Sequence, residues 1–489
     1  MSHMASVTGA NEDISEVKPK KNRCVRCLKN NLFMITIIAG VLIGFAIGFG
    51  LRELPYISED LKIWISMPGD IYIRVLKLTI LPLIMSNVIV VIARLDPKEN
   101  GKISLVAFIY IVIANIIGAA VGAACTAIIA PGSLNSGGGQ QENDPTKKSP
   151  TTSDVFADLF LNIFPDNIVG IAIYQVVTTY AYVGYNNTTG KHLFERVEAN
   201  DDGTNMIGVI FVAVAFGLAA SAAQEKGVSF LEFCASLSEV VLKLIRAFLK
   251  ATPVGVCFMI AGAIVKVDDI VSTFAKLGLF IATVFVGIAV LFIITLIVYV
   301  AGTRRNPFVV IPHLMKAWFL GFATTSAIVT VPEIYQGCDE LGIRKGLSRF
   351  VAPLAATLKA DGSACFIVCG CIFVAQLEEK SSPGTIVVIW LLTSALALAI
   401  PHIPSSSIVI MLTILTSVGV PVEQVSLLYA TEWLLDRVRT GMSTISTFYL
   451  IVFTHWVTLK SAGPEDQEGA NDEYDEVMSE LSKSFATKA

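Results

Sequence analysis

Long runs of apolar residues alternate with short polar segments along most of the chain. A run of about 20 apolar residues is long enough to cross a lipid bilayer as an α-helix. The runs therefore predict transmembrane helices throughout the N-terminal half. We expect three spans, a divided fourth element interrupted by a polar loop, and two further long spans, at residues 31–53, 60–94, 102–130, 153–223, 228–265 and 272–303.

Two apolar segments of the C-terminal half are interrupted near their centres. The first interruption reads GFATTS at residues 321–326, and the second reads PHIPSSS at residues 401–407. Each segment has the composition of two half-helices that meet at a polar tip, and neither half is long enough to span. Such backbone is tolerated at membrane depth only where protein or water covers it. Paired interruptions of this kind are typical of transporter binding sites.

A span that carries intramembrane charge follows each interrupted segment. Lys359 and Asp361 follow the first, and a cluster from Glu432 to Arg439 follows the second. The combination of hairpin and charged span thus occurs twice, which favours an inverted repeat. The predicted fold class is an all-α membrane protein with eight transmembrane spans and two re-entrant helical hairpins.

The composition agrees with this pattern. Hydrophobic residues make up 54% of the 489 positions, charged residues 16%, and the mean hydropathy is +0.67. Soluble domains carry about 25% charged residues, so we expect much of this surface to face the lipid bilayer. The net charge of −4 comes without a basic stripe, and no nucleic-acid partner is expected.

Lysine and arginine predict the orientation of the chain, because cytoplasmic loops carry an excess of both. Basic residues precede the first span and recur in alternating loops, which places both termini in the cytosol. The loop 133–203 then lies outside, where it offers two overlapping glycosylation acceptors, Asn186 and Asn187. We therefore expect a multi-pass glycoprotein of the plasma membrane.

The chain is predicted to have four parts. Residues 1–30 form a cytosolic N-terminal tail, and residues 31–303 form the six N-terminal spans with the extracellular loop. Residues 304–457 contain both hairpins and the seventh and eighth spans, which we expect to be the transport core. Residues 458–489 form an acidic cytosolic tail with the low hydrophobicity and high charge of disordered segments.

Ionisable residues inside a membrane are costly and by default functional. Glu432, Asp436 and Arg439 follow the spacing i, i+4, i+7 and share one helix face, whereas Arg437 points elsewhere. A zwitterionic, acidic solute requires a carboxylate for its ammonium group and a guanidinium for its side-chain carboxylate. Half-helix N-termini at the hairpin tips would hold its other carboxylate.

Structural roles are the alternative for these side chains. Lys359 with Asp361, and Asp436 with Arg439, also have the chemistry of two buried structural ion pairs. His402 at the second tip is either a proton-sensitive gate or a hydrogen-bonded structural histidine. For Asn115 in the third span, joining helices by hydrogen bonds is favoured over binding an ion.

Several motifs resemble those of one known family, over about residues 30–460. They are MPGD at 67–70, PVG at 253–255, DGS at 361–363 and WLLDRVRT at 433–440, of which the last is the most specific. The chain resembles the glutamate and neutral amino acid transporters, the dicarboxylate/amino acid:cation symporter family. The resemblance implies a homotrimer in which three transport domains slide as elevators against a central scaffold. It also implies an amino acid as the small-molecule substrate, no enzymatic activity, and a chloride conductance.

The resemblance further implies roles for single residues. Asp436 matches the aspartate that holds the substrate amine, and Arg439 matches the arginine that selects a side-chain carboxylate. Ser326 matches the first serine of the first hairpin tip, which helps to hold the α-carboxylate, and Thr440 keeps its type. These matches imply an acidic L-amino acid, such as glutamate or aspartate, as the substrate.

Other positions depart from the family at its sodium sites. The family's Asn-Met-Asp-Gly-Thr reads KADGS here, from Lys359 to Ser363, and two further ion ligands on the eighth span are replaced by Ser443 and Thr447. More departures occur at Ile113, Ala114, Ala327, Ile328, Ile367, Pro401 and His402. We therefore assign Ser443 to the substrate site, and to ion binding or gating Lys359, Asp361, Ser363, His402 and Thr447, with Asp361 as the one candidate sodium ligand.

The charges of the four ionisable residues indicate how these departures affect ion binding. Asp361 and Asp436 face Lys359 and Arg439, so the site is neutral without a metal ion. A sodium ion about 4 Å from a lysine ammonium would meet a repulsion of several kcal/mol at an effective dielectric constant of about 20. We predict that Lys359 substitutes for a bound cation and that sodium coupling is weakened or lost. No cofactor is expected apart from Na⁺ or Cl⁻.

The sequence thus predicts a secondary or exchange transporter of acidic amino acids with an elevator mechanism. Three alternatives stay open: an anion channel of the same architecture, a non-transporting receptor or scaffold, and a carrier that selects a different substrate. The presence of Asp436 together with Arg439 favours transport.

Overall fold

The computed structural model describes residues 32–54, 56–93, 97–133, 152–186, 191–266, 269–400 and 406–459. Several predictions lie outside these residues. They concern the N-terminal tail 1–30, His402 and the tip of the second hairpin, Asn187, and nearly all of the acidic tail 458–489.

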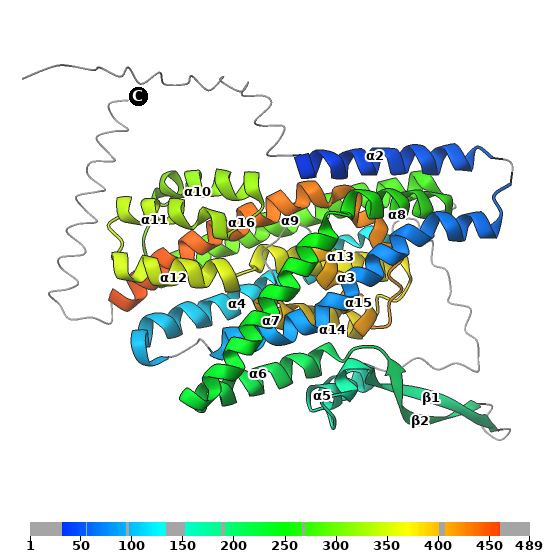
Figure 1. The fold of residues 1–489 in the computed structure, drawn as a ribbon, viewed down its shortest axis with the longest axis horizontal. Coiled ribbons are helices and arrows are strands. Elements are labelled where there is room, and N and C mark those ends of the chain that lie inside the picture. The colour runs from blue at the N-terminus through cyan, green and yellow to red at the C-terminus, as the bar shows by residue number, and fades with distance from the viewer. Residues whose placement is uncertain are drawn as a thin grey trace, which may run out of the picture.

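Long apolar helices build the N-terminal half, close to the predicted spans (Figure 1). They are α2 (Leu32–Arg52), α3 (Glu59–Ala93), α4 (Pro97–Ile129), α6 (Met206–Ala222), α7 (Glu225–Leu249), α8 (Thr252–Lys266) and α9 (Ile270–Thr303). The predicted fifth span is in fact the pair α7 and α8, which bends by 58° at its break. Pro253 stands in the first turn of α8, where a proline loses no helical hydrogen bond.

Six helices of the described residues are long and apolar enough to cross a membrane, or seven if the bent pair counts as one span. The one predicted span outside this count is the divided fourth element, which corresponds to α6, whose 17 residues fall short of the usual length of about 20. The chain is therefore a mostly helical, multi-pass membrane protein. The number of eight spans stays a prediction.

Two pairs of short helices distinguish the C-terminal half, and a longer helical segment follows each pair. Their arms have 10 to 14 residues, too short to span, as expected for re-entrant hairpins. The first pair is α10 (Ile311–Thr324) and α11 (Val331–Glu340), followed by α12 (Lys345–Leu358) and α13 (Asp361–Leu377). The second pair is α14 (Pro383–Leu396) and α15 (Ser406–Ser417), followed by α16 (Val425–Leu459). Single 3-10 turns lie at Pro131–Ser133, Gly170–Ala172, Pro307–Val309, Ile328–Thr330 and Ala397–Ala399.

The loop between α4 and α6 is not purely helical, which corrects the all-α prediction. It contains α5 (Thr152–Ile163) and an antiparallel hairpin of β1 (Tyr174–Asn186) and β2 (Lys191–Asp202), which projects from the helical body (Figure 1). Valine, threonine and tyrosine are frequent in β1, and these residues favour strands. An ion pair between Asp154 and Arg196, 3.0 Å long, ties the hairpin to α5. Asn186, the predicted glycan acceptor, is the last residue of β1.

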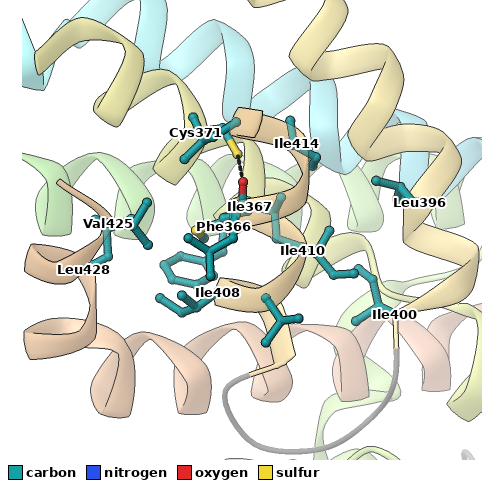
Figure 2. Packing of buried hydrophobic residues seen from close by; sticks show 14 of the residues in the cluster. Phe366, Ile367, Cys371, Leu396, Ile400, Ile408, Ile410, Ile414, Val425 and Leu428 are labelled. Atoms are coloured by element: carbon teal, nitrogen blue, oxygen red, sulfur yellow. Dashed lines mark hydrogen bonds between the residues drawn. The ribbon is translucent and has the colours of Figure 1, made fainter. Parts of the chain in front are cut away.

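Helix α13 occupies the centre of the helical body. Every residue from Asp361 to Gln376 is buried, as expected for a helix that is apolar on all sides. Figure 2 shows Phe366 and Ile367 of α13 among the isoleucines of α15, with Val425 and Leu428 of α16 nearby. This packing fixes the N-terminal end of α13, where the charged residues lie, against α16 and the second hairpin.

Glycines allow α4 to approach α13 closely. Gly118 and Gly122 form a GxxxG pattern, a spacing that lets helix backbones meet in membranes. A Cβ atom on Gly122 would lie 2.5 Å from the carbonyl oxygen of Cys365, and one on Gly118 would collide with the carbonyl of Asp361. The second collision shows that the position of Asp361 depends on this close contact.

We expect Gly122→Ala to destabilise the protein by about 1–3 kcal/mol, because the added methyl group has no room beside α13. The measurement is the thermal unfolding midpoint of the purified protein in detergent. Gly278→Ala in α9 is the matched control, since nothing lies within 4 Å of a Cβ atom there. An unchanged midpoint for Gly122→Ala would show that the two helices separate at little cost.

Candidate functional site

A break in the helix at Lys359 creates the site. α12 ends at Leu358, α13 begins at Asp361, and Lys359 between them is extended, with φ −90° and ψ 111°. Asn115 of α4 binds both ends of the break: its Nδ2 donates to the Leu358 carbonyl at 3.1 Å, and its Oδ1 accepts from the Ala360 amide at 2.9 Å. Two backbone groups that the break leaves without helical partners are thereby satisfied. The prediction that Asn115 joins helices is confirmed.

The first ion pair lies at this break. Lys359 Nζ is 2.6 Å from Asp361 Oδ2, and the side chains are 0% and 1% exposed. The Ser446 hydroxyl of α16 accepts a short hydrogen bond from Lys359 Nζ and lies 3.0 Å from Asp361 Oδ1, to which it donates. Ser446 therefore bridges the acid and the base. The sequence alone does not reveal this role, because a serine inside a helix gives no signal until its partners are known.

The second ion pair lies on α16, between Asp436 and Arg439. Arg439 also reaches α13, because its Nη1 donates to Ser363 Oγ at 2.5 Å. Gly362 permits this contact, since a Cβ atom there would lie 2.5 Å from the Arg439 carbonyl oxygen. Glu432, Asp436 and Arg439 are buried while Arg437 is half-buried, so the prediction that the first three share one face is confirmed.

The two ion pairs together make a buried site without net charge. They connect the start of α13 to the middle of α16 through Ser446 and through the contact of Arg439 with Ser363. Both ion pairs that were expected if these four residues have a structural role are formed. Truncating one member of such a pair leaves an uncompensated charge in the interior, so the four residues depend on one another.

Several buried hydroxyl groups of α15 and α16 lack hydrogen-bond partners among the described residues, and that of Ser443 lies beside Gly362 at the start of α13. They belong to Ser407 at the start of α15 and to Ser443 and Thr447 of α16, all of which are buried. The Nε atom of Arg439 also lacks a hydrogen-bond partner among the described residues. A buried polar atom without a partner costs about 1–3 kcal/mol. These groups therefore mark where a polar ligand would be stabilised, between α13, the second hairpin and α16.

The remaining predicted site residues differ in how the structure places them. Thr440 is buried on α16 beside Arg439. Ser326 lies half-buried at the turn after α10, and within the described residues no hydrogen bond joins it to Asp436 or Arg439. The arm that carries it does approach α16, because a Cβ atom on Gly321 would lie 2.5 Å from Thr444 Oγ1.

An apolar cavity of about 270 Å³ lies on the other side of Asp361, between α4, α9 and α16. Its wall includes Ile113 and Ala114, the positions where the sequence departs from the expected sodium ligands. The hydroxyl of Thr295 in the same wall already donates to the Leu291 carbonyl. Sodium requires a shell of oxygen ligands, and this wall supplies few. No group of three or more histidine, cysteine or acidic side chains fit for a metal ion occurs in the described part of the chain.

Comparison with known proteins adds to this geometry. Residues 33–454 match the sequence model of the sodium:dicarboxylate symporter family. The chain is 33% identical to excitatory amino acid transporter 3 of Oryctolagus cuniculus over 455 residues, which cover 88% of this chain and 86% of that protein. It is 33% identical to excitatory amino acid transporter 2 of Rattus norvegicus, covering 90% and 84%, and 31% identical to an excitatory amino acid transporter of Onchocerca volvulus, covering 86% and 88%.

We expect Lys359→Met to destabilise the protein by about 3–5 kcal/mol, because Asp361 would be left as a buried, unpaired charge. The double variant Lys359→Met/Asp361→Asn removes both charges and should recover most of that loss. Thermal unfolding in detergent measures both effects.

Lys62→Met is the control for the first variant. Lys62 forms an ion pair of similar length with Glu59, 2.7 Å, but both side chains are partly or largely exposed, and such pairs contribute little. If the double variant were as unstable as Lys359→Met, the loss would come from packing and not from the charge.

Proposed function

The chain belongs to the sodium:dicarboxylate symporter family, and on this premise we propose that it carries acidic L-amino acids such as glutamate and aspartate across the plasma membrane. The family consists of transporters and not of enzymes. The observation that supports the proposal best is the neutral cluster of Asp436, Arg439 and Ser363 beside buried hydroxyl groups that lack partners.

The cluster suits a zwitterionic acid with one additional carboxylate. Asp436 would bind the ammonium group of the substrate, and Arg439 would bind its side-chain carboxylate through two parallel hydrogen bonds. On binding, Asp436 and Arg439 thus exchange their mutual ion pair for separate ion pairs with the substrate. An acidic amino acid carries one net negative charge, so the charge of the site changes by only one unit. Ser443 and Thr447 offer hydroxyl groups to its remaining polar atoms.

The hairpins would complete the site. In the proposed elevator cycle, Ser326 and the second tip close over the α-carboxylate, and residues 304–457 move as a transport core against a scaffold built from the N-terminal spans. Three copies would form the trimer. Residues 1–30 and 458–489 would lie in the cytosol, and the loop with Asn186 and Asn187 outside.

Lys359 determines the proposed ion dependence. Its ammonium group lies 2.6 Å from Asp361, so it occupies the position next to the carboxylate that a sodium ion would need. The apolar cavity wall at Ile113 and Ala114 removes oxygen ligands from the other side of Asp361. We therefore propose exchange or facilitated transport in which the coupling to sodium is weakened or absent.

Arg439→Ala should abolish binding of glutamate and aspartate, because the carboxylate loses its charged partner. Loss of a hydrogen bond to a charged group costs about 1.5–3 kcal/mol, which predicts at least a tenfold weaker thermal-shift response to acidic ligands. Arg437→Ala is the matched control: it removes the same charge two residues away, where the guanidinium binds the Trp433 carbonyl of its own helix. Unchanged glutamate binding by Arg439→Ala would refute the assignment of the substrate.

Replacing sodium with choline should leave most of the uptake of labelled substrate in proteoliposomes, because Lys359 supplies the positive charge next to Asp361. Initial rates at equal ionic strength are the measurement, with protein-free liposomes as the blank. Strict dependence on sodium would contradict the role of Lys359. Lys359→Asn alone should not create such dependence, because other ligand positions also differ from the family.

A further inference from the structure

Basic residues surround the C-terminal end of α16. The guanidinium of Arg305 lies 3.5 Å above the ring of Trp456, and Ile343, the neighbour of Arg344, is buried in one hydrophobic cluster with Trp456 and Leu459. Arg305 belongs to the loop before α10, and Arg344 immediately precedes α12. The loops that enter and leave the first hairpin therefore meet at the last turns of α16.

We call this set the basic collar and define it as Arg304, Arg305, Arg344 and Lys345. Arg305 is half-buried and the other three residues are exposed. Neither Arg304 nor Lys345 forms an ion pair with another residue of the described segments. The collar thus presents a concentrated positive charge at one end of the helical body.

The two acidic residues at the C-terminal end of α11 pair with basic residues outside the collar. Asp339 pairs with Arg349 at 2.7 Å, and Glu340 pairs with Lys316 at 3.7 Å and with His313 at 3.3 Å. These pairs hold α11 to α10 and α12. Within the described segments, none of these pairs involves Arg304 or Lys345.

The segment that follows α16 has the complementary charge. Residues 461–489 contain eight acidic residues, all between Glu465 and Glu480, and only two lysines. Glu465 comes six residues after Leu459, the end of α16. Six residues reach about 20 Å when extended, and the collar contacts the helix at Trp456, so the acidic segment begins within reach. Attachment to α16 also gives it a high effective concentration at the collar.

We propose that the acidic segment 465–480 of this chain binds the basic collar. By joining the loops on both sides of the first hairpin, the bound segment restrains the hairpin at its base. Exposed ion pairs contribute little one at a time, so the contact depends on several carboxylates and weakens with salt. The effect on transport rests on the proposed function, whereas the contact itself does not.

Zero-length carbodiimide cross-linking of the full-length protein tests the contact. In nanodiscs of neutral phosphatidylcholine, we expect mass spectrometry to find peptides that join Lys345 to carboxylates of residues 465–476. They should decrease at least fivefold in 1 M salt and in the variant Arg304→Gln/Arg344→Gln. Lys62, which lies far along the sequence and pairs with Glu59, is the control lysine and should yield none.

Two outcomes would overturn the proposal. In the first, the acidic segment cross-links only to the N-terminal lysines Lys18, Lys20 and Lys21, which would make the N-terminal tail its partner. In the second, the Lys345 cross-links disappear in nanodiscs that contain anionic phosphatidylglycerol, which would make lipid headgroups the occupant of the collar.

Exchange rates test the consequence for transport. The variant Glu465→Gln/Asp466→Asn/Glu468→Gln should exchange substrate about fivefold faster, as expected from losing two or three exposed ion pairs. The variant Lys483→Gln/Lys488→Gln changes the same segment outside its acidic part and should exchange at the original rate. If cross-links form and no variant transports, the proposed function fails and the contact stands. If transport persists without cross-links, the contact alone fails.

Discussion

A lysine and an aspartate held together without solvent, at the depth of a membrane, set the conditions for the rest of the structure. Charges at that depth are tolerated only as partners of one another and of hydrogen-bonding groups. Asn115 satisfies the broken helix on both sides of Lys359, and Ser446 links the lysine to Asp361. Gly118 lets α4 come close enough for Asn115 to do so. Each of these residues is explained by the cost of leaving that pair incomplete.

The same constraint connects the fold to the site. Because α13 is buried on all sides, its first residues are fixed relative to α16, and Ser363 meets Arg439. A site built on two packed helices holds its charges in defined positions, which the proposed recognition of a carboxylate would require. The buried hydroxyl groups of Ser443 and Thr447 then remain for a ligand or for water, since the ion pairs already satisfy each other.

Sequence patterns predicted the helices well where the signal was continuous. Apolar runs located α2, α3, α4 and α9, and interrupted runs located both hairpins. Sequence patterns did not predict two features whose signal is not hydrophobicity. The β1–β2 hairpin lies in a polar loop, where membrane hydropathy carries no information and only β-propensity could have revealed it. In the sequence, α7 and α8 look like one long span, because the two helices together are apolar enough to cross a membrane. The bend between them was therefore not predicted.

By itself, the sequence determined that this is a membrane protein, that its C-terminal half carries charge among interrupted helices, and that Asp436 and Arg439 share a helix face. These follow from composition and from helical periodicity, which are local properties. The tertiary structure decided that Ser446 joins the first ion pair and that Arg439 contacts Ser363 across two helices. Such contacts connect residues more than 70 positions apart, and no local pattern encodes them. They depend on how closely the glycine-lined helices approach.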